Sequence, residues 1–335
     1  MKFIFGPVNS RRLGISLGID LLPPKTCNFN CIYCEVGPTT DFATERGEYT
    51  DTAAIIDEID VFGANQAAVS RLDILTITAS GEPTLHAGLG RIIEHLKKNI
   101  AKPVAVLTNG SLLHLAEVRR ELAAADIVIP SLDAAREASF RKINRPTAAC
   151  RLEQVITGLA DFCRDFNGRC WLEVLLARGI NDRPEDLAAL VAAAQRIKPE
   201  RIQLNTVVRP PIEAYALPLT LDEMRAAAAI FPGPVDILTD YTPGTSTAVV
   251  AEPLTATKGQ LKDIERRREA VLHLLQRRPC TATDVSVALG LPSQEVAAAL
   301  EHLRELGRIE PSSHRDKEYF IVLPQRQEPL PDKNL

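Results

Sequence analysis

Three cysteines stand close together near the start of the chain, at positions 27, 31 and 34. Their C-x3-C-x2-C spacing allows three thiols to converge on one inorganic centre when the loop between Lys25 and Glu35 curls around it. A structural zinc site takes four ligands, usually from two C-x2-C pairs, and this stretch offers neither a second pair nor a histidine. A cluster of four irons with three cysteines instead leaves one iron open to a substrate or cosubstrate. We therefore predict a 4Fe-4S cluster on Cys27, Cys31 and Cys34; the alternative is three small core residues that are close by chance.

The cysteine loop resembles that of the radical S-adenosylmethionine (radical SAM) enzymes, with the aromatic Tyr33 directly before the last cysteine. The resemblance implies that the open iron chelates the amino and carboxylate groups of S-adenosylmethionine. It also implies reductive cleavage of this cosubstrate to a 5'-deoxyadenosyl radical, which abstracts a hydrogen atom from a substrate. The electron would come from a donor such as flavodoxin or ferredoxin.

Composition and length constrain the class of protein. The chain has 335 residues, enough for one large domain plus a small one, or for two medium ones. Its 45% hydrophobic and 24% charged residues are ordinary for a globular protein, and its net charge of -4 gives no global basic field for nucleic acid.

The sequence also bears on the compartment of the protein. We find no uninterrupted apolar run of about 18 residues and no signal peptide, so we expect a cytoplasmic protein with no membrane partner. Seven cysteines in such a chain indicate metal or redox chemistry more than disulfides.

Behind the cysteine loop the sequence alternates between short apolar strands and amphipathic helices. This alternation predicts βαβ units and a parallel sheet, here a partial (βα)6 TIM-type barrel of the radical SAM kind, with the site at the C-terminal ends of the strands. The strands are expected at 15–22, 73–80, 103–109, 126–132, 170–177 and 201–207, and the helices at 51–60, 87–99, 113–124, 151–166, 184–196 and 220–231.

Polar residues follow the first strand after the cysteine loop. Ser80, Gly81 and Glu82 resemble the family's Gly-Gly-Glu element, which binds the amino group of S-adenosylmethionine through backbone and a carboxylate. Ser80 replaces the first glycine of that element, and Gly81 keeps the turn open. By this resemblance the three residues are cosubstrate contacts.

Further polar residues end the next two strands. Asn109 is a candidate cosubstrate contact, or else accepts the hydrogen bonds of its own turn. Ser131 and Asp133 share one face and resemble the family's ribose-contact region, with Asp133 alternatively the N-cap of the following helix.

The last two strands carry polar groups as well. Glu173 lies in an apolar run, and a buried carboxylate needs a partner or a task; we predict a cosubstrate or substrate contact, unless the strand is an edge facing water. Gln203 and Asn205 are two residues apart, so they share the inner face, and Asn205 is a further candidate contact. Near the N-terminus, Arg11 and Arg12 are either a phosphate or carboxylate site or a solvated pair.

The four remaining cysteines do not form a second cluster in the sequence pattern. Cys163 falls on a predicted helix whose two ends are flanked by Cys150 and Cys170, and Cys280 lies far away. We expect them to be small buried hydrophobic residues.

The C-terminal part is predicted to be a separate, winged-helix-like domain. Three helices are expected at 264–278, 281–289 and 293–306, followed by two short strands at 308–311 and 317–323. Between 266 and 323 there are nine Lys and Arg against eight Asp and Glu, and the basic cluster lies on the first helix, at 266–268, 277 and 278, instead of on the recognition helix. RNA, DNA, a polypeptide or the barrel itself are all open as its partner.

The predicted domains are a radical SAM core at 1–245, a linker at 246–263, the winged-helix-like domain at 264–323 and a flexible tail at 324–335. Residues 5–14 and 204–211, with the cysteine loop, resemble the subgroup that includes the tRNA wyosine-base synthases, which implies tRNA or another RNA as substrate. Those enzymes bind a second cluster through upstream cysteines, and this chain has none before Cys27. A peptide- or protein-modifying radical enzyme and a non-catalytic iron-sulfur regulator are the alternative hypotheses.

Overall fold

The computed structural model describes residues 1–10, 12–78, 80–238 and 264–323. Its main element is an eight-stranded sheet in the order β1-β2-β5-β6-β7-β8-β9-β10. The edge strand β1 is antiparallel to β2, and all other neighbours are parallel. The strands are β1 (Ile4–Ser10), β2 (Gly14–Asp20), β5 (Ile74–Thr78), β6 (Val104–Thr108), β7 (Ile127–Pro130), β8 (Arg169–Leu176), β9 (Arg201–Thr206) and β10 (Val235–Leu238). This confirms the predicted α/β class with a mostly parallel sheet.

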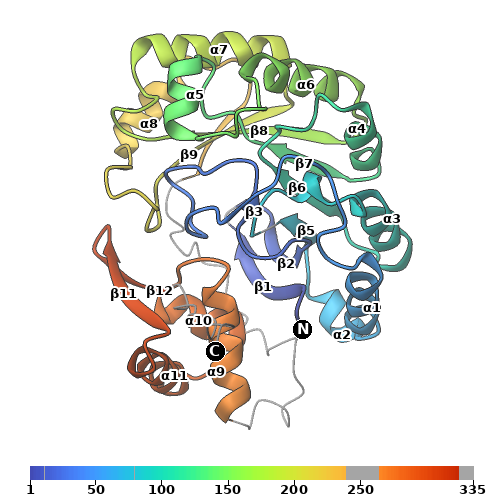
Figure 1. The fold of residues 1–335 in the computed structure, drawn as a ribbon, viewed down its shortest axis with the longest axis vertical. Coiled ribbons are helices and arrows are strands. Elements are labelled where there is room, and N and C mark those ends of the chain that lie inside the picture. The colour runs from blue at the N-terminus through green and yellow to red at the C-terminus, as the bar shows by residue number, and fades with distance from the viewer. Residues whose placement is uncertain (11, 79, 239–263, 324–335) are drawn as a thin grey trace, which may run out of the picture.

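Helices line the outer side of the curved sheet (Figure 1). They are α1 (Thr52–Gly63), α2 (Gln66–Ser70), α3 (Leu89–Asn99), α4 (Ala116–Leu122), α5 (Glu137–Ile143), α6 (Leu152–Asp165), α7 (Pro184–Ile197) and α8 (Leu221–Ala228). A short 3-10 turn, η1 (Pro83–Leu85), and the two-residue strands β3 (Thr26–Cys27) and β4 (Asp41–Phe42) complete this part.

Local sequence signals explain where these helices begin and which face they bury. In α3 the buried residues Leu89, Ile92, Ile93 and Leu96 follow helical spacing and pack against the sheet. The side chain of Asp51 caps α1 by accepting a hydrogen bond from the backbone N–H of Ala53, at 2.9 Å. Side-chain caps also start α2, at Asn65, and α8, at Thr220, whereas α3 to α7 begin without one.

The concave side of the sheet is filled at one end by a small apolar cluster. It contains Ile74, Ala105, Ile127, Ile129 and Trp171, which come from four adjacent strands. Except for Ile129, these residues lie in the N-terminal halves of their strands, so apolar side chains fill this end of the barrel. The C-terminal ends of the same strands are left for polar groups.

Four strands, β1, β3, β4 and β10, and two helices, α2 and α5, were not predicted. Strand β1 contains Gly6 and Pro7, which read as turn signals, and its pairing with β2 shifts register between Phe5 and Val8. Strand β10 has four residues, of which one is buried, and α5 is a seven-residue helix. Short elements of this kind carry too little periodicity to stand out in a sequence.

The C-terminal unit consists of three helices and a two-stranded antiparallel sheet. They are α9 (Ile264–Leu275), α10 (Ala282–Leu289), α11 (Ser293–Glu305), β11 (Ile309–His314) and β12 (Lys317–Val322), built around their own apolar core. The predicted elements are thus present, and their classification as a winged helix stays a prediction. The predicted linker at 246–263 and the tail at 324–335 lie outside the described residues.

The C-terminal unit contacts the barrel directly. The ring nitrogen Nε2 of His314 lies 3.1 Å from the carbonyl oxygen of Val207, and the Tyr319 hydroxyl donates to the carbonyl of Val208. Below β1 and β2 in Figure 1, α9 and α10 approach the same side of the sheet. The unit therefore closes one side of the barrel.

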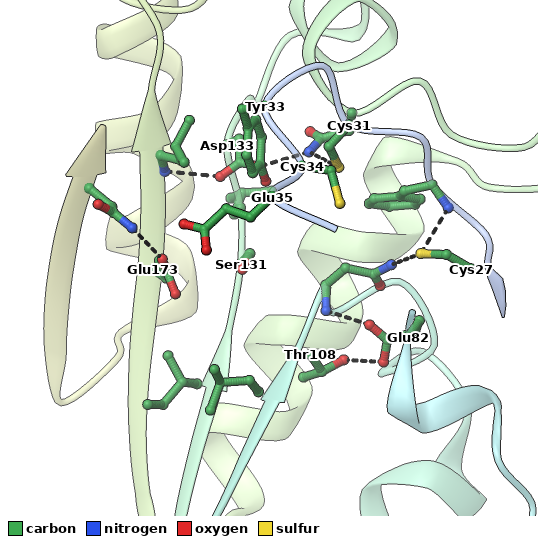
Figure 2. A pocket seen from close by; sticks show the side chains of 18 of the residues that line it. Cys27, Cys31, Tyr33, Cys34, Glu35, Glu82, Thr108, Ser131, Asp133 and Glu173 are labelled. Atoms are coloured by element: carbon green, nitrogen blue, oxygen red, sulfur yellow. Dashed lines mark hydrogen bonds between the residues drawn. The ribbon is translucent and has the colours of Figure 1, made fainter. Parts of the chain in front are cut away.

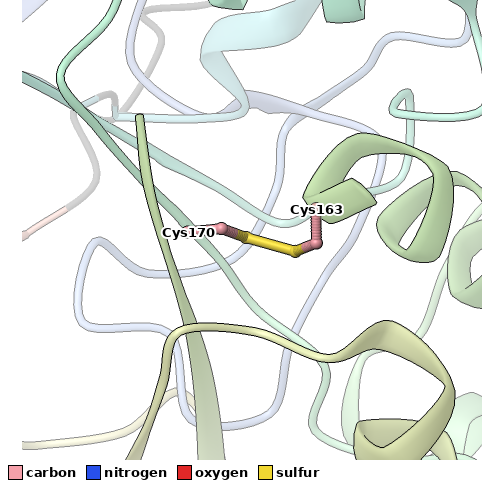
Figure 3. The surroundings of a disulfide bond; sticks show 2 residues. All are labelled: Cys163 and Cys170. Carbon is pink, nitrogen blue, oxygen red and sulfur yellow. A yellow bond between two sulfur atoms is a disulfide. The ribbon is translucent and has the colours of Figure 1, made fainter. Parts of the chain in front are cut away.

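One disulfide corrects the expectation for the remaining cysteines. Cys163 on α6 is bonded to Cys170 on β8 (Figure 3). The bond joins a helix to the strand that follows it, a separation of seven residues that the sequence pattern did not single out. Cys150 and Cys280 are free thiols, and Cys280 is buried.

None of the helices in the described ranges has the length and apolar character needed to cross a membrane.

Candidate active site

A pocket of about 290 Å³ lies at the C-terminal ends of the parallel strands (Figure 2). The loop after β2 brings Cys27, Cys31 and Cys34 to one side of it, while the strand ends supply its other walls. Of the other predicted site residues, the pocket is lined by Tyr33, Gly81, Glu82, Asn109, Ser131, Asp133, Glu173 and Asn205. Ser80 does not line it.

Nitrogen donors point at the three cysteine sulfurs. Lys25 Nζ lies 3.5 Å from Cys34 Sγ and Asn144 Nδ2 lies 3.4 Å from Cys31 Sγ. Cys27 Sγ receives the backbone N–H of Phe29 at 3.4 Å and the side-chain amide of Asn109 at 3.9 Å. Donors of this kind stabilise thiolates and the sulfides of a bound cluster.

The three thiols suit a cluster better than a single ion. Within the part of the chain that the structure describes, no three His, Cys, Asp or Glu side chains form a group that could hold one metal ion. A cubane distributes its cysteines over different irons, so its ligands stand farther apart. Burial raises the pKa of the Cys27 thiol to about 12 and that of Cys31 well above its ordinary value. Cationic iron would replace the proton and compensate the charge of each buried thiolate.

Gly81 allows the turn after β5 to touch the start of the cysteine loop. A Cβ at this position would stand 1.7 Å from the carbonyl oxygen of Thr26, so any larger residue would push the two segments apart. Two backbone hydrogen bonds join the segments, from Lys25 N to Ser80 O at 2.7 Å and from Glu82 N to Thr26 O at 3.3 Å. The glycine that the sequence singled out therefore fixes the cluster loop on the sheet.

Glu82 is buried, and both oxygens of its carboxylate accept hydrogen bonds from other residues. Oε1 accepts from Thr84 N at 3.0 Å and from the hydroxyls of Thr84 and Thr108 at 2.6 Å each, and Oε2 accepts from Asn109 N at 2.6 Å. Burial raises its pKa, which these hydrogen bonds oppose. The side chain holds two strand ends together at the edge of the pocket, and its direct contact to a cosubstrate stays a prediction.

Ser80 contacts Asp20 instead of the cluster pocket. Its hydroxyl donates to Asp20 Oδ2 at 2.6 Å and its backbone N–H donates to Asp20 Oδ1 at 3.1 Å. The residue that replaces a glycine in the family element is thus used to orient a buried carboxylate instead of lining the cluster pocket.

Asp133 connects the cysteine loop to the middle of the sheet. It accepts a hydrogen bond from the Tyr33 hydroxyl at 2.5 Å, from Asn144 Nδ2 at 2.6 Å and from Leu175 N at 2.9 Å. Burial is the main cause that raises the pKa of Asp133 to about 6. Helix α5 begins at Glu137, so the alternative that Asp133 is its N-cap is wrong.

Glu173 has a cationic partner that the sequence did not predict for it. Arg12 Nη1 lies 2.5 Å from Glu173 Oε2, and Asn205 Nδ2 donates to Oε1 at 3.0 Å. Strand β8 lies between β7 and β9, so Glu173 is not on an edge strand facing water. Arg12 also reaches Gln203 Oε1 at 3.4 Å, whereas Arg11 lies outside the described residues.

A second ion pair lines the same pocket: Arg209 Nη1 lies 2.7 Å from Glu35 Oε2.

Sequence reasoning missed Asn144 and Lys25 as sulfur contacts. Asn144 follows the unpredicted helix α5, more than 100 residues from the cysteine loop, and no local pattern marks it. Lys25 stands two residues before the first cysteine and has a positive φ of 68°, which turns the chain into the loop. Its position beside the cysteines is the sequence signal that could have identified it as a sulfur contact.

Comparison with known proteins agrees with this geometry. The radical SAM superfamily model matches residues 21–191. The fold is similar to that of a radical SAM methyltransferase from Sphaerobacter thermophilus, with a TM-score of 0.52 at 14% identity over 70% of this chain and 68% of that one. The class that fold and site define is therefore that of the radical SAM enzymes, whose members carry a 4Fe-4S cluster and use S-adenosylmethionine.

Sequence relatives narrow the class further. A UPF0026 protein of Helicobacter pylori strain J99 is 32% identical over 86% of this chain and 88% of its own length. A UPF0026 protein of Synechocystis is 38% identical over 62% of this chain and 76% of its own. A protein of Brachyspira hyodysenteriae named GTPase Obg is 36% identical over 92% of this chain, which spans 43% of that protein. The chain belongs to the UPF0026 family of the radical SAM superfamily.

Proposed function

We propose that this enzyme cleaves S-adenosylmethionine reductively and uses the 5'-deoxyadenosyl radical to abstract hydrogen from a substrate held beside the cysteine loop. The observation that carries the proposal is the convergence of three free cysteine thiols, each facing a nitrogen donor, on a pocket at the C-terminal ends of parallel strands. A 4Fe-4S cluster bound by these thiols supplies the electron for the cleavage.

The residues around the pocket have distinct roles in this proposal. Lys25, Asn109 and Asn144 hold the thiolates by hydrogen bonds and shield them from water. Glu82 fixes the ends of β5 and β6, so that the backbone of the Gly81 turn is presented to the amino group of the cosubstrate. Glu173, held by Arg12 and Asn205, is a polar group of the strand wall that we assign to the ribose or the substrate.

The test is cluster reconstitution under anaerobic conditions, followed by reduction with dithionite in the presence of S-adenosylmethionine. We expect 5'-deoxyadenosine from the wild type and none from Cys31→Ala. Cys150→Ala is the matched control, because Cys150 is a free thiol outside the loop. Formation of 5'-deoxyadenosine by Cys31→Ala at the wild-type rate would overturn the assignment of the ligands.

RNA, including tRNA, is the substrate class that we propose. The resemblance to the wyosine-base synthases supports it, as does a C-terminal unit with the helix and strand order of a winged helix. Arg277 and Arg278 also favour an anionic substrate, because both line a cavity inside the protein. Turnover-dependent change in an RNA pool, measured by mass spectrometry of its nucleosides, tests this class, and change confined to a peptide extract would favour the polypeptide alternative.

A further inference from the structure

A second cavity, of about 310 Å³, adjoins the cluster pocket. The two cavities lie side by side, because they share six lining residues: Glu35, Thr78, Leu107, Glu173, Asn205 and Arg209. The second cavity extends from there towards β1, β2 and the residues that follow α9. None of the predicted cosubstrate contacts except Ser80, Glu173 and Asn205 line it.

Positive side chains outnumber negative ones around this cavity. The described lining residues include four arginines and three carboxylates. Three pairs account for six of them: Arg12 with Glu173 at 2.5 Å, Arg209 with Glu35 at 2.7 Å, and Arg277 with Asp20 at 3.6 Å.

Arg278 is the arginine left over. Its Nε atom is buried and has no hydrogen-bond partner, and its guanidinium forms no ion pair with any residue of the described ranges. The side chain as a whole is half-buried. A buried N–H group without a partner costs free energy, because it has lost water and gained no hydrogen bond in exchange. A ligand that brings an anion into the cavity would remove this cost.

The neighbouring Arg277 is fixed firmly in place. Its Nη2 donates to the carbonyl of Lys2 at 2.8 Å and its Nη1 to that of His273 at 3.0 Å, while the guanidinium lies 4.8 Å from the centre of the Phe5 ring. Phe5 in turn occupies the space above Gly18, where a Cβ would come within 2.1 Å of the ring. Strands β1 and β2 thus determine where the segment after α9 enters the cavity.

We propose that this cavity binds an oxyanion of the substrate, a phosphate or a carboxylate, with Arg278 as its principal partner and Arg277 beside it. The planar guanidinium presents paired N–H donors that match the two oxygens of either group. Because the cavity adjoins the cluster pocket, an anion held there places the rest of the molecule near the cosubstrate. The assignment deepens the proposed function, on which it rests for the identity of the adjoining pocket.

The test is the melting temperature of the reconstituted full-length protein, measured against increasing sodium phosphate or sodium acetate at an ionic strength held constant with sodium chloride. A ligand that binds the native state raises this temperature in a concentration-dependent way. We expect phosphate, acetate or both to stabilise the wild type, and Arg278→Met and Arg278→Gln to weaken the apparent affinity by about ten-fold or more.

Arg266→Met is the matched control, because Arg266 is an exposed arginine on the same C-terminal unit. It should keep the full shift. The proposal would be overturned if neither phosphate nor acetate raised the melting temperature of the wild type above that in sodium chloride alone. It would also be overturned if both Arg278 variants showed the same rise as the wild type. Ribose 5-phosphate and a single-stranded ten-residue RNA, added in separate series, distinguish a free small molecule from a nucleotide within RNA as the source of the anion.

The same preparations separate this proposal from the proposed function. The melting experiment needs neither reductant nor S-adenosylmethionine, whereas 5'-deoxyadenosine formation needs both. Anion binding without cosubstrate cleavage would leave the cavity assignment standing and remove the radical chemistry, and cleavage without anion binding would do the reverse.

Discussion

At the scale of single residues, the candidate site depends on buried carboxylates that accept several hydrogen bonds from other parts of the protein. Glu82 and Asp133 are buried carboxylates, and each accepts from backbone and side-chain donors on separate segments of the chain. Such groups hold their neighbours in one arrangement, because any other would leave a buried charge without donors. The pocket is therefore shaped before a cofactor binds.

Glu82→Gln should destabilise the fold. Each carboxylate oxygen accepts from a backbone N–H, Oε1 from Thr84 and Oε2 from Asn109, so an amide nitrogen at either position faces a donor that cannot turn away. We expect a loss of about 1–3 kcal/mol in the free energy of unfolding, measured by urea denaturation. Glu94→Gln, on the exposed face of α3, is the control and should change it by less than about 0.5 kcal/mol. Equal effects of the two substitutions would contradict the role given to Glu82.

Asn144→Leu should shift the reduction potential of the reconstituted cluster to a more negative value. Its Nδ2 lies 3.4 Å from Cys31 Sγ, and N–H donors to sulfur favour the reduced, more negatively charged cluster. A redox titration followed by electron paramagnetic resonance measures the shift. Asn99→Leu, an exposed asparagine at the end of α3, is the control, and a potential unchanged in Asn144→Leu would contradict the interpretation of this contact.

At the scale of elements, the sequence predicted the strands and helices with strong periodicity and missed the rest. The strands β2 and β5 to β9 and the helices α3, α6 and α7 were predicted because their apolar residues repeat at the spacing of strand or helix. The cysteine ligands and the Gly81 turn were found because their types and spacing are local. Asn144, the Arg12–Glu173 pair and the second cavity join residues far apart in the chain, and no local pattern encodes such contacts.

Gly18→Ala tests how β1 and β2 are joined. The added methyl group would meet the Phe5 ring at 2.1 Å and displace it, together with the Arg277 guanidinium that lies on the ring. We expect a loss of about 1–3 kcal/mol in stability by urea denaturation. Gly63→Ala, at the end of α1, is the control: the nearest atoms lie at 3.6 Å, so it should be neutral or stabilising by up to about 1 kcal/mol. Gly18→Ala as stable as the wild type would show that Phe5 moves freely.

At the scale of the whole molecule, the barrel and the C-terminal unit each have their own apolar core and contact each other along one side of the barrel. Polar and charged groups make this contact: Arg277 reaches Lys2 and Asp20, and His314 and Tyr319 reach the segment after β9. An interface of this composition responds to protonation more than an apolar one does.

His273 on α9 should make the stability of the folded chain depend on pH. Burial, Arg277 and the N-terminal amino group lower its pKa to about 4, against the opposing effect of Glu58. The unfolded chain takes up the proton near its ordinary pKa of 6.5 and the folded chain only near 4. Unfolding therefore binds a proton in this interval, and stability falls as the pH falls.

The measurement is urea denaturation at pH 7 and pH 5 for the wild type and for His273→Gln. Glutamine does not titrate, so the variant should lose less stability between the two pH values, by roughly 1 kcal/mol after allowance for the partial exposure of the ring. Identical losses in the two proteins would mean that His273 takes up its proton equally well in the folded chain.

The contact between the barrel and the C-terminal unit bears on how an enzyme of this kind could evolve to act on new substrates. The groups proposed to generate the radical come from the cysteine loop and the strand ends, whereas Arg277 and Arg278 belong to a different stretch of chain. A chimera with another C-terminal unit would keep the same radical source and present other side chains to the same interior space. With the proposed role of Arg277 and Arg278, exchange of the C-terminal unit would change which molecule is bound and leave the radical source as it is.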